Sequence, residues 1–343
     1  MKGRLPLNSG NSGVRKHNLI YWYYDPMQFT GAITMLLHTK KRSFRILLPL
    51  LLCFFLSGCS PGGTSGKTEL YTPGKTSVQV PEASGDETLG GDPLLMDISN
   101  RNQGYVMALL NEEGKKAAIQ IIGPDGVTYK YFLEEAGAYA VFPLTAGNGD
   151  YLILAYENVG GDQYASLFSQ SVTVELANEF LPFLYPNQYV DFTGDSEAVA
   201  LASQLSADAE TDLDALTGIY EYLINHLSYD NEKAENVQAN YLPDVDSTLK
   251  TGTGICFDYA SLMAAMLRSL GIPTKLEIGY SAAIRHAWVD VYIESVGWVE
   301  HAVEFNGDEW KLMDPTFAST GKDDPAMADY IGDGENYTVQ YIR

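Results

Sequence analysis

Cys256 stands where a cysteine can act as a nucleophile. It follows Gly252-Thr253-Gly254-Ile255 and precedes apolar residues at helical spacing over 259–270, which end at Gly271-Ile272-Pro273. We therefore predict a helix that begins at about Cys256. Unpaired N–H groups and the helix dipole at such an N-terminus favour a thiolate, and the glycines let a substrate or another backbone approach. The alternative is an inert, buried cysteine.

A thiolate nucleophile needs a general base, and that base needs an orienting group. Three histidines follow residue 58, namely His226, His286 and His301. His226 ends a helical stretch before the thiol, where packing or helix capping is the favoured role. His301 has no second ligand at a convincing spacing, so we expect no metal site there. His286 opens a strand-like run after the cysteine helix, and Asp314 closes a later run.

Three blocks, in this order, resemble the transglutaminase-like superfamily, whose core is similar to that of papain-like cysteine proteases. The blocks are Gly254-x-Cys256-x-Asp258-Tyr259-Ala260, His286-Ala287-Trp288 and Trp310-x-x-x-Asp314-Pro315-Thr316, within residues 195–320. The resemblance implies that Cys256 is the nucleophile, His286 the general base and acid, and Asp314 the residue that orients the imidazole. A thiol at a helix start that faces two adjacent strands would bring the three groups into one cleft.

Other residues have supporting roles in this prediction. The backbone N–H of Cys256 is a candidate oxyanion donor. Animal members of the family add a side-chain donor upstream of the cysteine; Gln238, Asn240 and Tyr241 lie in that interval, and we take Tyr241 as the candidate although no motif selects among them. Asp258 is expected to support the first helical turn rather than to take part in chemistry.

Two tryptophans, Trp288 and Trp310, are expected to pack on the sheet beside the site or to wall a substrate groove. No phosphate loop, zinc motif or EF-hand loop occurs in the sequence, and no local pattern selects a pair of acids for glycoside hydrolysis. We therefore expect neither a cofactor nor a metal.

Two domains are predicted to carry these residues. Over 93–176, short apolar runs alternate with turn signals, and Gly123-Pro124-Asp125-Gly126 and Gly147-Asn148-Gly149-Asp150 are typical of hairpins, which predicts a small all-β sandwich that serves as a spacer or packing partner rather than a binding module. The predicted strands are residues 105–110, 117–122, 127–133, 139–144, 151–156 and 171–176.

The region 177–343 is predicted to be the catalytic domain. Helical periodicity over 196–205 and 212–226 precedes an irregular stretch, 227–250, and then the cysteine helix. Strand-like runs follow at 274–280, 287–293, 298–305 and 310–314, with the hairpin dipeptide Asn306-Gly307 between the last two. Helices followed by an antiparallel sheet indicate an α+β fold, a papain-like or transglutaminase-like core with the cysteine helix packed on the sheet.

The N-terminal region looks like a targeting segment. Basic residues at 40–45 precede an apolar run, 46–56, that is shorter than a membrane-spanning helix. The sequence Leu56-Ser57-Gly58-Cys59 resembles the lipobox of bacterial lipoproteins, which implies cleavage before Cys59 and a lipid on its thiol. The alternative is a buried hydrophobic helix. We expect 1–58 to be a signal region, with 1–34 an over-extended start before Met35, and 59–92 to be the lipidated cysteine and a flexible tether.

Charge and cysteine content exclude several classes of protein. The 343 residues include 22 basic and 44 acidic side chains, and the residues after 58 retain 14 basic and 43 acidic ones, a net charge of −29. Such a charge disfavours nucleic-acid binding. Three cysteines exclude a disulfide scaffold, and if Cys53 leaves with the signal and Cys59 carries lipid, Cys256 is the remaining free thiol.

These observations predict an enzyme that is lipid-anchored to the bacterial membrane outside the cytoplasm and acts on peptide or protein amides. Hydrolysis is slightly favoured over cross-linking, because nothing identifies a site for an amine acceptor. The rival hypothesis is a binding or assembly module that keeps the fold without turnover.

Overall fold

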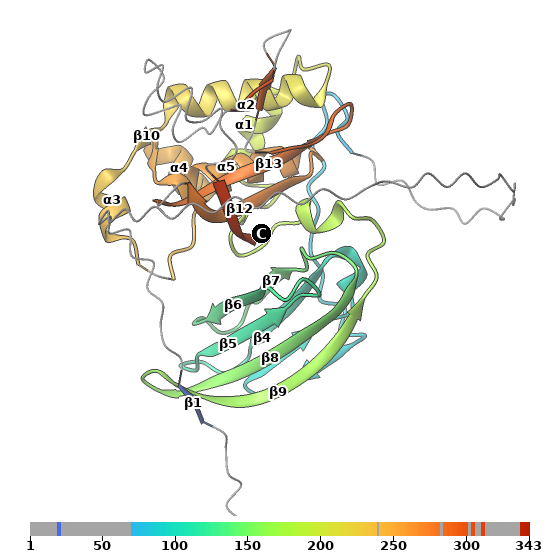
Figure 1. Cartoon of the computed structure of the whole chain (residues 1–343), viewed down its shortest axis with the longest axis vertical. Coiled ribbons are helices and arrows are strands. Elements are labelled where there is room, and N and C mark those ends of the chain that lie inside the picture. Colours follow the sequence, from blue (N-terminus) through green and yellow to red (C-terminus); the bar gives the residue numbers. More distant parts are fainter. Residues whose placement is uncertain are drawn as a thin grey trace, which may run out of the picture.

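The computed structural model describes residues 19–21, 70–238, 240–281, 284–300, 303–305, 310–312 and 337–343. These residues form a β part, lower in Figure 1, and an α+β part above it. Each part has its own cluster of buried apolar side chains. The predicted fold class, α+β behind N-terminal β-sheets, is confirmed.

Two antiparallel sheets build the β part around one shared cluster, to which Val106 of one sheet and Ile153 of the other both belong. The strand orders are β2-β3-β4-β7 and β1-β9-β8-β5-β6. A short 3-10 helix, Arg101–Gln103, precedes β4. The strands are β1 (Leu19–Tyr21), β2 (Thr88–Gly90), β3 (Leu94–Asp97), β4 (Tyr105–Leu110), β5 (Ala117–Ile122), β6 (Thr128–Leu133), β7 (Tyr139–Pro143), β8 (Gly149–Gly160) and β9 (Gln163–Val174).

The two glycine turns of the β part differ from each other. Between β5 and β6 the predicted hairpin forms, with Gly126 N–H donating to Gly123 C=O at 2.9 Å and Gly126 at φ 80°. The hairpin predicted at Gly147 to Asp150 is wrong, because β7 and β8 belong to different sheets. This turn carries the chain across the sandwich. A turn sequence specifies a local reversal, not which sheet receives the next strand.

The α+β part contains helices on one four-stranded antiparallel sheet, with strand order β14-β13-β12-β17. A 3-10 helix, Leu181–Phe183, leads into it. The helices are α1 (Glu197–Leu205), α2 (Asp212–His226), α3 (Asn231–Asn236), α4 (Val245–Thr251) and α5 (Cys256–Ser269). The strands are β10 (Ser228–Tyr229), β11 (Thr253–Gly254), β12 (Thr274–Ser281), β13 (Ile284–Ile293), β14 (Gly297–Val299), β15 (Val303–Phe305), β16 (Trp310–Leu312) and β17 (Tyr337–Ile342).

Two predictions for this part need correction. The stretch 227–250 is not irregular, since it holds β10, α3 and α4. Asp230 and Asp244 begin these two helices, each accepting a hydrogen bond from the backbone N–H three residues later. The single strand expected over 298–305 is two strands, β14 and β15, which pair with β13 and β16 respectively.

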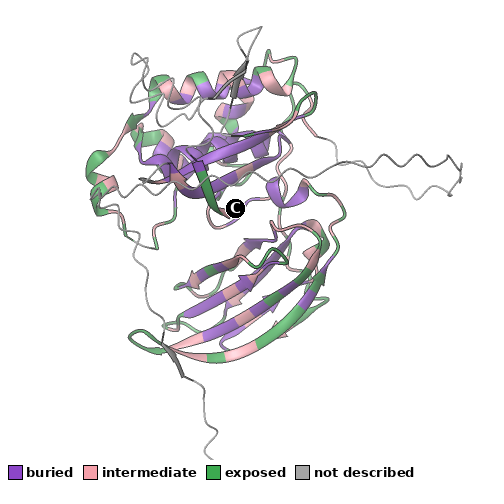
Figure 2. Ribbon diagram, viewed as in Figure 1, coloured by how far each residue is buried: buried purple, intermediate pink, exposed green. Residues whose placement is uncertain are grey.

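Helix α5 occupies the centre of the α+β part. Every residue from Cys256 to Ser269 is buried, and in Figure 2 the centre of the α+β part, where this helix lies, is mostly in the buried colour. It contacts α1, α2 and α4 as well as β12 and β13. Apolar side chains all round a helix require cover on every face. The fold therefore holds the helix that begins with Cys256 rigidly against the antiparallel sheet, as the sequence predicts.

Part of the predicted tether is packed on the fold, so the prediction is wrong from residue 70 onward. Tyr71 and Val78 pack against the cluster of the α+β part, and Ser77 N–H donates to Ser269 C=O at 2.6 Å. β2 also lies within the range expected to be tether. Burial of the apolar side chains in this Gly- and Ser-rich segment contributes favourable free energy of folding, which the composition of the segment did not indicate.

The proposed lipidation site Cys59 and most of the proposed signal region lie outside the described residues. Within the part of the chain that the structure describes, no helix is both long and apolar enough to span a bilayer.

Candidate active site

Cys256 is the first residue of α5. Its thiol is free, and the residue is 3% exposed. Ile255 before it is extended, at φ −96° and ψ 174°. Gly252, at φ 66°, caps α4, and β11 pairs in parallel with β10. The glycine-containing segment therefore turns the chain tightly from one helix into the next, which explains why the thiol stands at a helix N-terminus.

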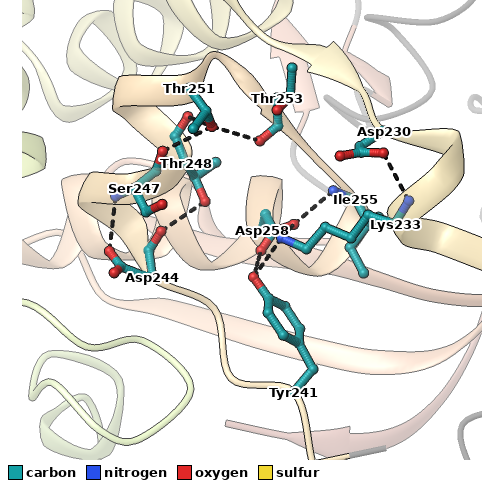
Figure 3. Close-up of polar contacts among 10 residues, drawn as sticks. All are labelled: Asp230, Lys233, Tyr241, Asp244, Ser247, Thr248, Thr251, Thr253, Ile255 and Asp258. Carbon is teal, nitrogen blue, oxygen red and sulfur yellow. Dashed lines mark hydrogen bonds and ion pairs between the residues drawn. The ribbon is translucent and has the colours of Figure 1, made fainter. Parts of the chain in front are cut away.

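Asp258, in the first turn of α5, lies at the centre of a group of polar contacts (Figure 3). This carboxylate is fully buried, and it accepts hydrogen bonds from Ile255 N–H at 2.8 Å, from Lys233 Nζ at 2.7 Å and from the Tyr241 hydroxyl. A Cβ on Gly254 would meet the Cβ of Asp258 at 2.7 Å. The supporting role predicted for Asp258 thus matches its contacts, and Gly254 is required for its close fit.

Tyr241 lies against this carboxylate. Its hydroxyl donates to Asp258 and accepts from Lys233 Nζ at 2.7 Å, while the same ammonium lies 4.3 Å from the centre of the Tyr241 ring. Burial and then the hydrogen bond to Asp258 raise the pKa of Tyr241. A phenol has one O–H to donate. In this structure Tyr241 directs that O–H to Asp258, so an oxyanion would have to compete for it.

His286 lies on β13, opposite Gly279 of β12, and is 4% exposed. Its ring stacks near Trp288, with centroids 6.1 Å apart, and lies 6.4 Å from the ring of Tyr337. A Cβ on Gly279 would come within 2.0 Å of Thr338 C=O. Glycine at this position lets β17 approach the strand that lies beside the histidine.

Trp288 connects this histidine to a buried pair of carboxyl groups. Its indole N–H donates to Glu277 at 2.9 Å, and Asp290 follows two residues later on the same strand. Burial, followed by the proximity of Asp290, raises the pKa of Glu277 to about 8. Trp288 is buried, so it packs beside His286 and does not form an open groove wall.

Strand parity divides the sheet into two faces. Ala287 and Val289 belong to the apolar cluster that contains Cys256, whereas His286 and Trp288 alternate with them along β13. The described residues therefore place His286 and Cys256 on neighbouring elements without showing a contact between them. The pairing of the two stays a prediction.

Asp314 and His301 lie outside the described residues, and of Trp310 only its place on β16 is described. His226 closes α2: its Nδ1 lies 2.9 Å from Tyr222 C=O, and its ring stacks on that of Tyr222. This arrangement agrees with the predicted capping role. Among the residues described, no three His, Cys, Asp or Glu side chains gather in a way that could hold a metal ion.

Residues 199–302 match the profile of the Transglutaminase-like superfamily. This segment is a transglutaminase-like domain. It includes Cys256 and His286 and ends before Asp314. The match begins within α1 and extends past β14, so it covers α5 and the strands β12 and β13 on which α5 packs.

Relatives of the transglutaminase-like domain are distant. The chain is 29% identical over 119 residues to the uncharacterized protein YebA of Bacillus subtilis, covering 29% of this chain and 16% of YebA. It is 26% identical over 176 residues to the human kyphoscoliosis peptidase, covering 47% of this chain and 24% of that protein. The chain thus spans about a quarter or less of these curated relatives.

Among solved structures, a "putative cysteine protease" from Cytophaga hutchinsonii aligns with 70% of this chain and 78% of its own, at 14% identity and a TM-score of 0.35. Red sea bream transglutaminase aligns with 66% of this chain and 53% of its own, at 12% identity and a TM-score of 0.24.

Sequence reasoning missed two groups of supporting residues in the transglutaminase-like domain. Lys233 forms an ion pair with Asp258, and Glu277, which lies close to Asp290, accepts the Trp288 indole N–H. The alternation of Lys275, Glu277 and Gly279 with apolar residues is a strand signal that marks Glu277 as facing away from α5. No local signal links Lys233 to Asp258, because their contact depends on how α3 packs.

Proposed function

We propose that this chain is a thiol-dependent acyl-transfer enzyme that acts on peptide or protein amides through Cys256, His286 and Asp314. The observation that carries the proposal is the position of Cys256: a free thiol at the N-terminus of a central helix, inside a transglutaminase-like domain. A reactive thiol requires such a fixed, anion-favouring position.

The chemistry follows from these groups. The Cys256 thiolate attacks the amide carbon, and His286, holding the proton of the thiol, gives it to the departing amine. A thioester remains on Cys256. Water then attacks the thioester with His286 as base, releasing a carboxylic acid and restoring the thiol, whereas attack by a second amine would give a cross-link. Asp314 would hold the imidazole in the orientation that both steps need.

We favour hydrolysis over cross-linking. The similarity to a protein named a peptidase supports this choice, and nothing in the sequence identifies an amine-acceptor site. The enzyme would act at the outside of a bacterial membrane, held by lipid on Cys59, on peptide or protein substrates and without nucleic acid. Loss of incorporated alkyne-palmitate in Cys59→Ser would support the anchor; equal incorporation would contradict it.

Alkylation tests the nucleophile directly. In the full chain carrying Cys53→Ser and Cys59→Ser, Cys256 is the remaining thiol, and we expect iodoacetamide to modify it faster than it modifies a free cysteine at neutral pH. His286→Ala should slow this reaction at neutral pH. His226→Ala is the matched control, because His226 only closes α2. Alkylation no faster than that of a free cysteine would instead support a non-catalytic binding module.

Turnover then separates the two reactions. Gln-containing peptides are incubated with the parent chain and with Cys256→Ala, with and without a labelled primary amine. Peptide cleavage that is lost in Cys256→Ala would establish hydrolysis. Amine incorporation lost in the same variant would establish transamidation and overturn our preference.

A further inference from the structure

A cavity of about 820 Å³ lies between the β part and the α+β part. Met107 and Val141 line it from the first part, and Ile278 and Arg285 from the second. Ile278 belongs to the apolar cluster that includes Cys256, and Arg285 directly precedes His286. The volume is typical of ligand sites. The cavity therefore joins the β part to the surroundings of the proposed catalytic residues.

Two tyrosines bring the cavity close to the start of α5. Tyr189 and Tyr241 both line it, and their ring centres lie 6.0 Å and 6.3 Å from that of Phe257, the residue after Cys256. A chain lying in the cavity thus reaches the first turn of the helix that carries the thiol.

The outer edge of β7, which faces away from β4, forms one wall of this cavity. β7 is the last strand of its sheet and pairs with β4 alone among the named strands. Leu144 N–H donates to Gly104 C=O at 2.8 Å, and bonded pairs alternate along an antiparallel ladder, so Tyr139 and Val141 direct their N–H and C=O groups away from β4. Gln188 N–H donates to Val141 C=O at 3.4 Å, which confirms the outward direction.

Buried polar atoms without partners belong to residues of the same cavity. In the described part of the chain, Asn187 Nδ2, Gln188 Oε1 and Arg343 Nε have no hydrogen-bond partner, and Asn187 and Arg343 are 3% and 4% exposed. A buried donor or acceptor that has no hydrogen-bond partner destabilises the fold. Two donors and one acceptor are the groups that a peptide backbone would satisfy.

We infer that an extended peptide binds in this cavity as an added strand on β7. The main-chain groups of Tyr139 and the N–H of Val141 would pair with its backbone, and the apolar wall around Met107 and Ile278 would take alternate side chains. The inference rests on the proposed function, since it assigns the β part the task of holding the peptide substrate of the thiol site.

Proline substitution tests the edge. Fluorescein-labelled β-casein, an extended protein, is titrated by anisotropy into the full chain carrying Cys256→Ala, where binding is independent of turnover. Val141→Pro removes an outward N–H and no bond to β4, and we expect binding to weaken at least tenfold. Thr88→Pro is the matched control: by the same parity Thr88 directs its N–H outward on β2, the opposite edge of this sheet, and should leave binding unchanged.

Gln188→Met is a second test of the same site, needed because Val141→Pro could weaken binding merely by disturbing the fold. It nearly keeps the side-chain shape and removes a buried oxygen that has no partner, so thermal stability should stay or rise while casein binding weakens several-fold. A merely structural role would move stability and binding together. Unchanged casein binding in both Val141→Pro and Gln188→Met would overturn the inference.

The outcomes separate this inference from the proposed function. Casein binding that depends on Val141, without turnover by the parent chain, would keep the peptide site and reject the enzyme. Turnover with a KM that neither substitution raises would keep the enzyme and reject the β7 site. When Val141→Pro or Gln188→Met is placed instead in the chain that keeps Cys256 and carries Cys53→Ser and Cys59→Ser, iodoacetamide should alkylate Cys256 at the parent rate, because the small reagent does not need the edge strand.

Discussion

The Tyr241 hydroxyl donates a hydrogen bond to the carboxylate of Asp258, which lies two residues after Cys256. Lys233 contacts both groups at 2.7 Å. A loop residue and a residue of α3 therefore hold the first turn of α5, although neither belongs to the motif around the cysteine. The position of the thiol depends on side chains that are remote in sequence.

Asp258→Ala should lower the free energy of unfolding by about 3 kcal/mol, because it leaves the Lys233 charge and the Ile255 N–H without their buried partner. Urea unfolding measures this. Lys116→Ala is the control, since Lys116 and Glu134 form an exposed pair with side chains 51% and 50% accessible, worth less than about 1 kcal/mol. Equal losses in the two variants would mean that Asp258 does not support α5.

Tyr241→Phe distinguishes support from catalysis. Since the hydroxyl is bonded to Asp258, we expect a loss of roughly 1 kcal/mol in stability and less than a tenfold fall in kcat. A donor to the oxyanion would instead cost about 100-fold or more in kcat with stability almost unchanged. Steady-state kinetics on a peptide substrate, together with urea unfolding, separate the two results.

Stability should fall as pH rises from about 4.5 towards 8. Burial and Asp290 raise the pKa of Glu277 from 4.5 to about 8, so in that interval the folded chain keeps a proton that the unfolded chain has lost. The free energy of unfolding then declines by up to about 1.4 kcal/mol per pH unit from this group. Urea titrations at pH 5, 6.5 and 8 measure the slope.

Glu277→Gln should flatten that slope, because the amide oxygen still accepts from the Trp288 indole and the residue no longer titrates. Glu221→Gln, on the exposed surface of α2, should leave the slope as it is. A pH dependence that is identical in parent and Glu277→Gln would show that another group carries the shift.

Arg343 joins the two parts, and Arg343→Met should lower the Tm markedly. Its Nη1 donates to the Tyr131 hydroxyl at 2.8 Å, and its guanidinium lies 4.6 to 5.4 Å from the ring centres of Tyr129, Tyr131, Tyr189 and Tyr341. The loss should be roughly 3 kcal/mol. Calorimetry checks it against Lys275→Met, which removes two cation–π contacts, with Trp298 and Phe183, that do not involve the β part.

Local patterns in the sequence predict the elements that carry strong periodicity. α2 begins and ends as its apolar spacing indicates, and β4 and β5 match the predicted runs. β17 was not predicted, although Tyr337, Val339 and Tyr341 alternate with polar residues. Its place beside β12 depends on the approach that Gly279 permits. Which strands pair with each other is decided by tertiary packing, and short windows of sequence carry no information about that packing.

Local sequence patterns likewise predict only part of the candidate active site. The position of Cys256 at a helix start follows from the glycines before it and the helical spacing after it, and the supporting role of Asp258 follows from its place in the first turn. The contacts of Lys233, Tyr241 and Glu277 join separate elements, so only the fold reveals them. For Tyr241 in particular, sequence position suggested a reactive role where the structure shows a structural bond.

The pairing of β17 with β12 has a consequence for the order of folding. Arg268 and Tyr131 both form hydrogen bonds with Arg343, which lies 75 and 212 positions further along the chain. Neither part can therefore reach its final contacts early in synthesis. Until residues 337–342 arrive, β12 exposes an unpaired edge, and such edges recruit strands from other molecules. Chains that lack this strand should therefore aggregate, because the edge of β12 beside the sheet that carries α5 then stays open.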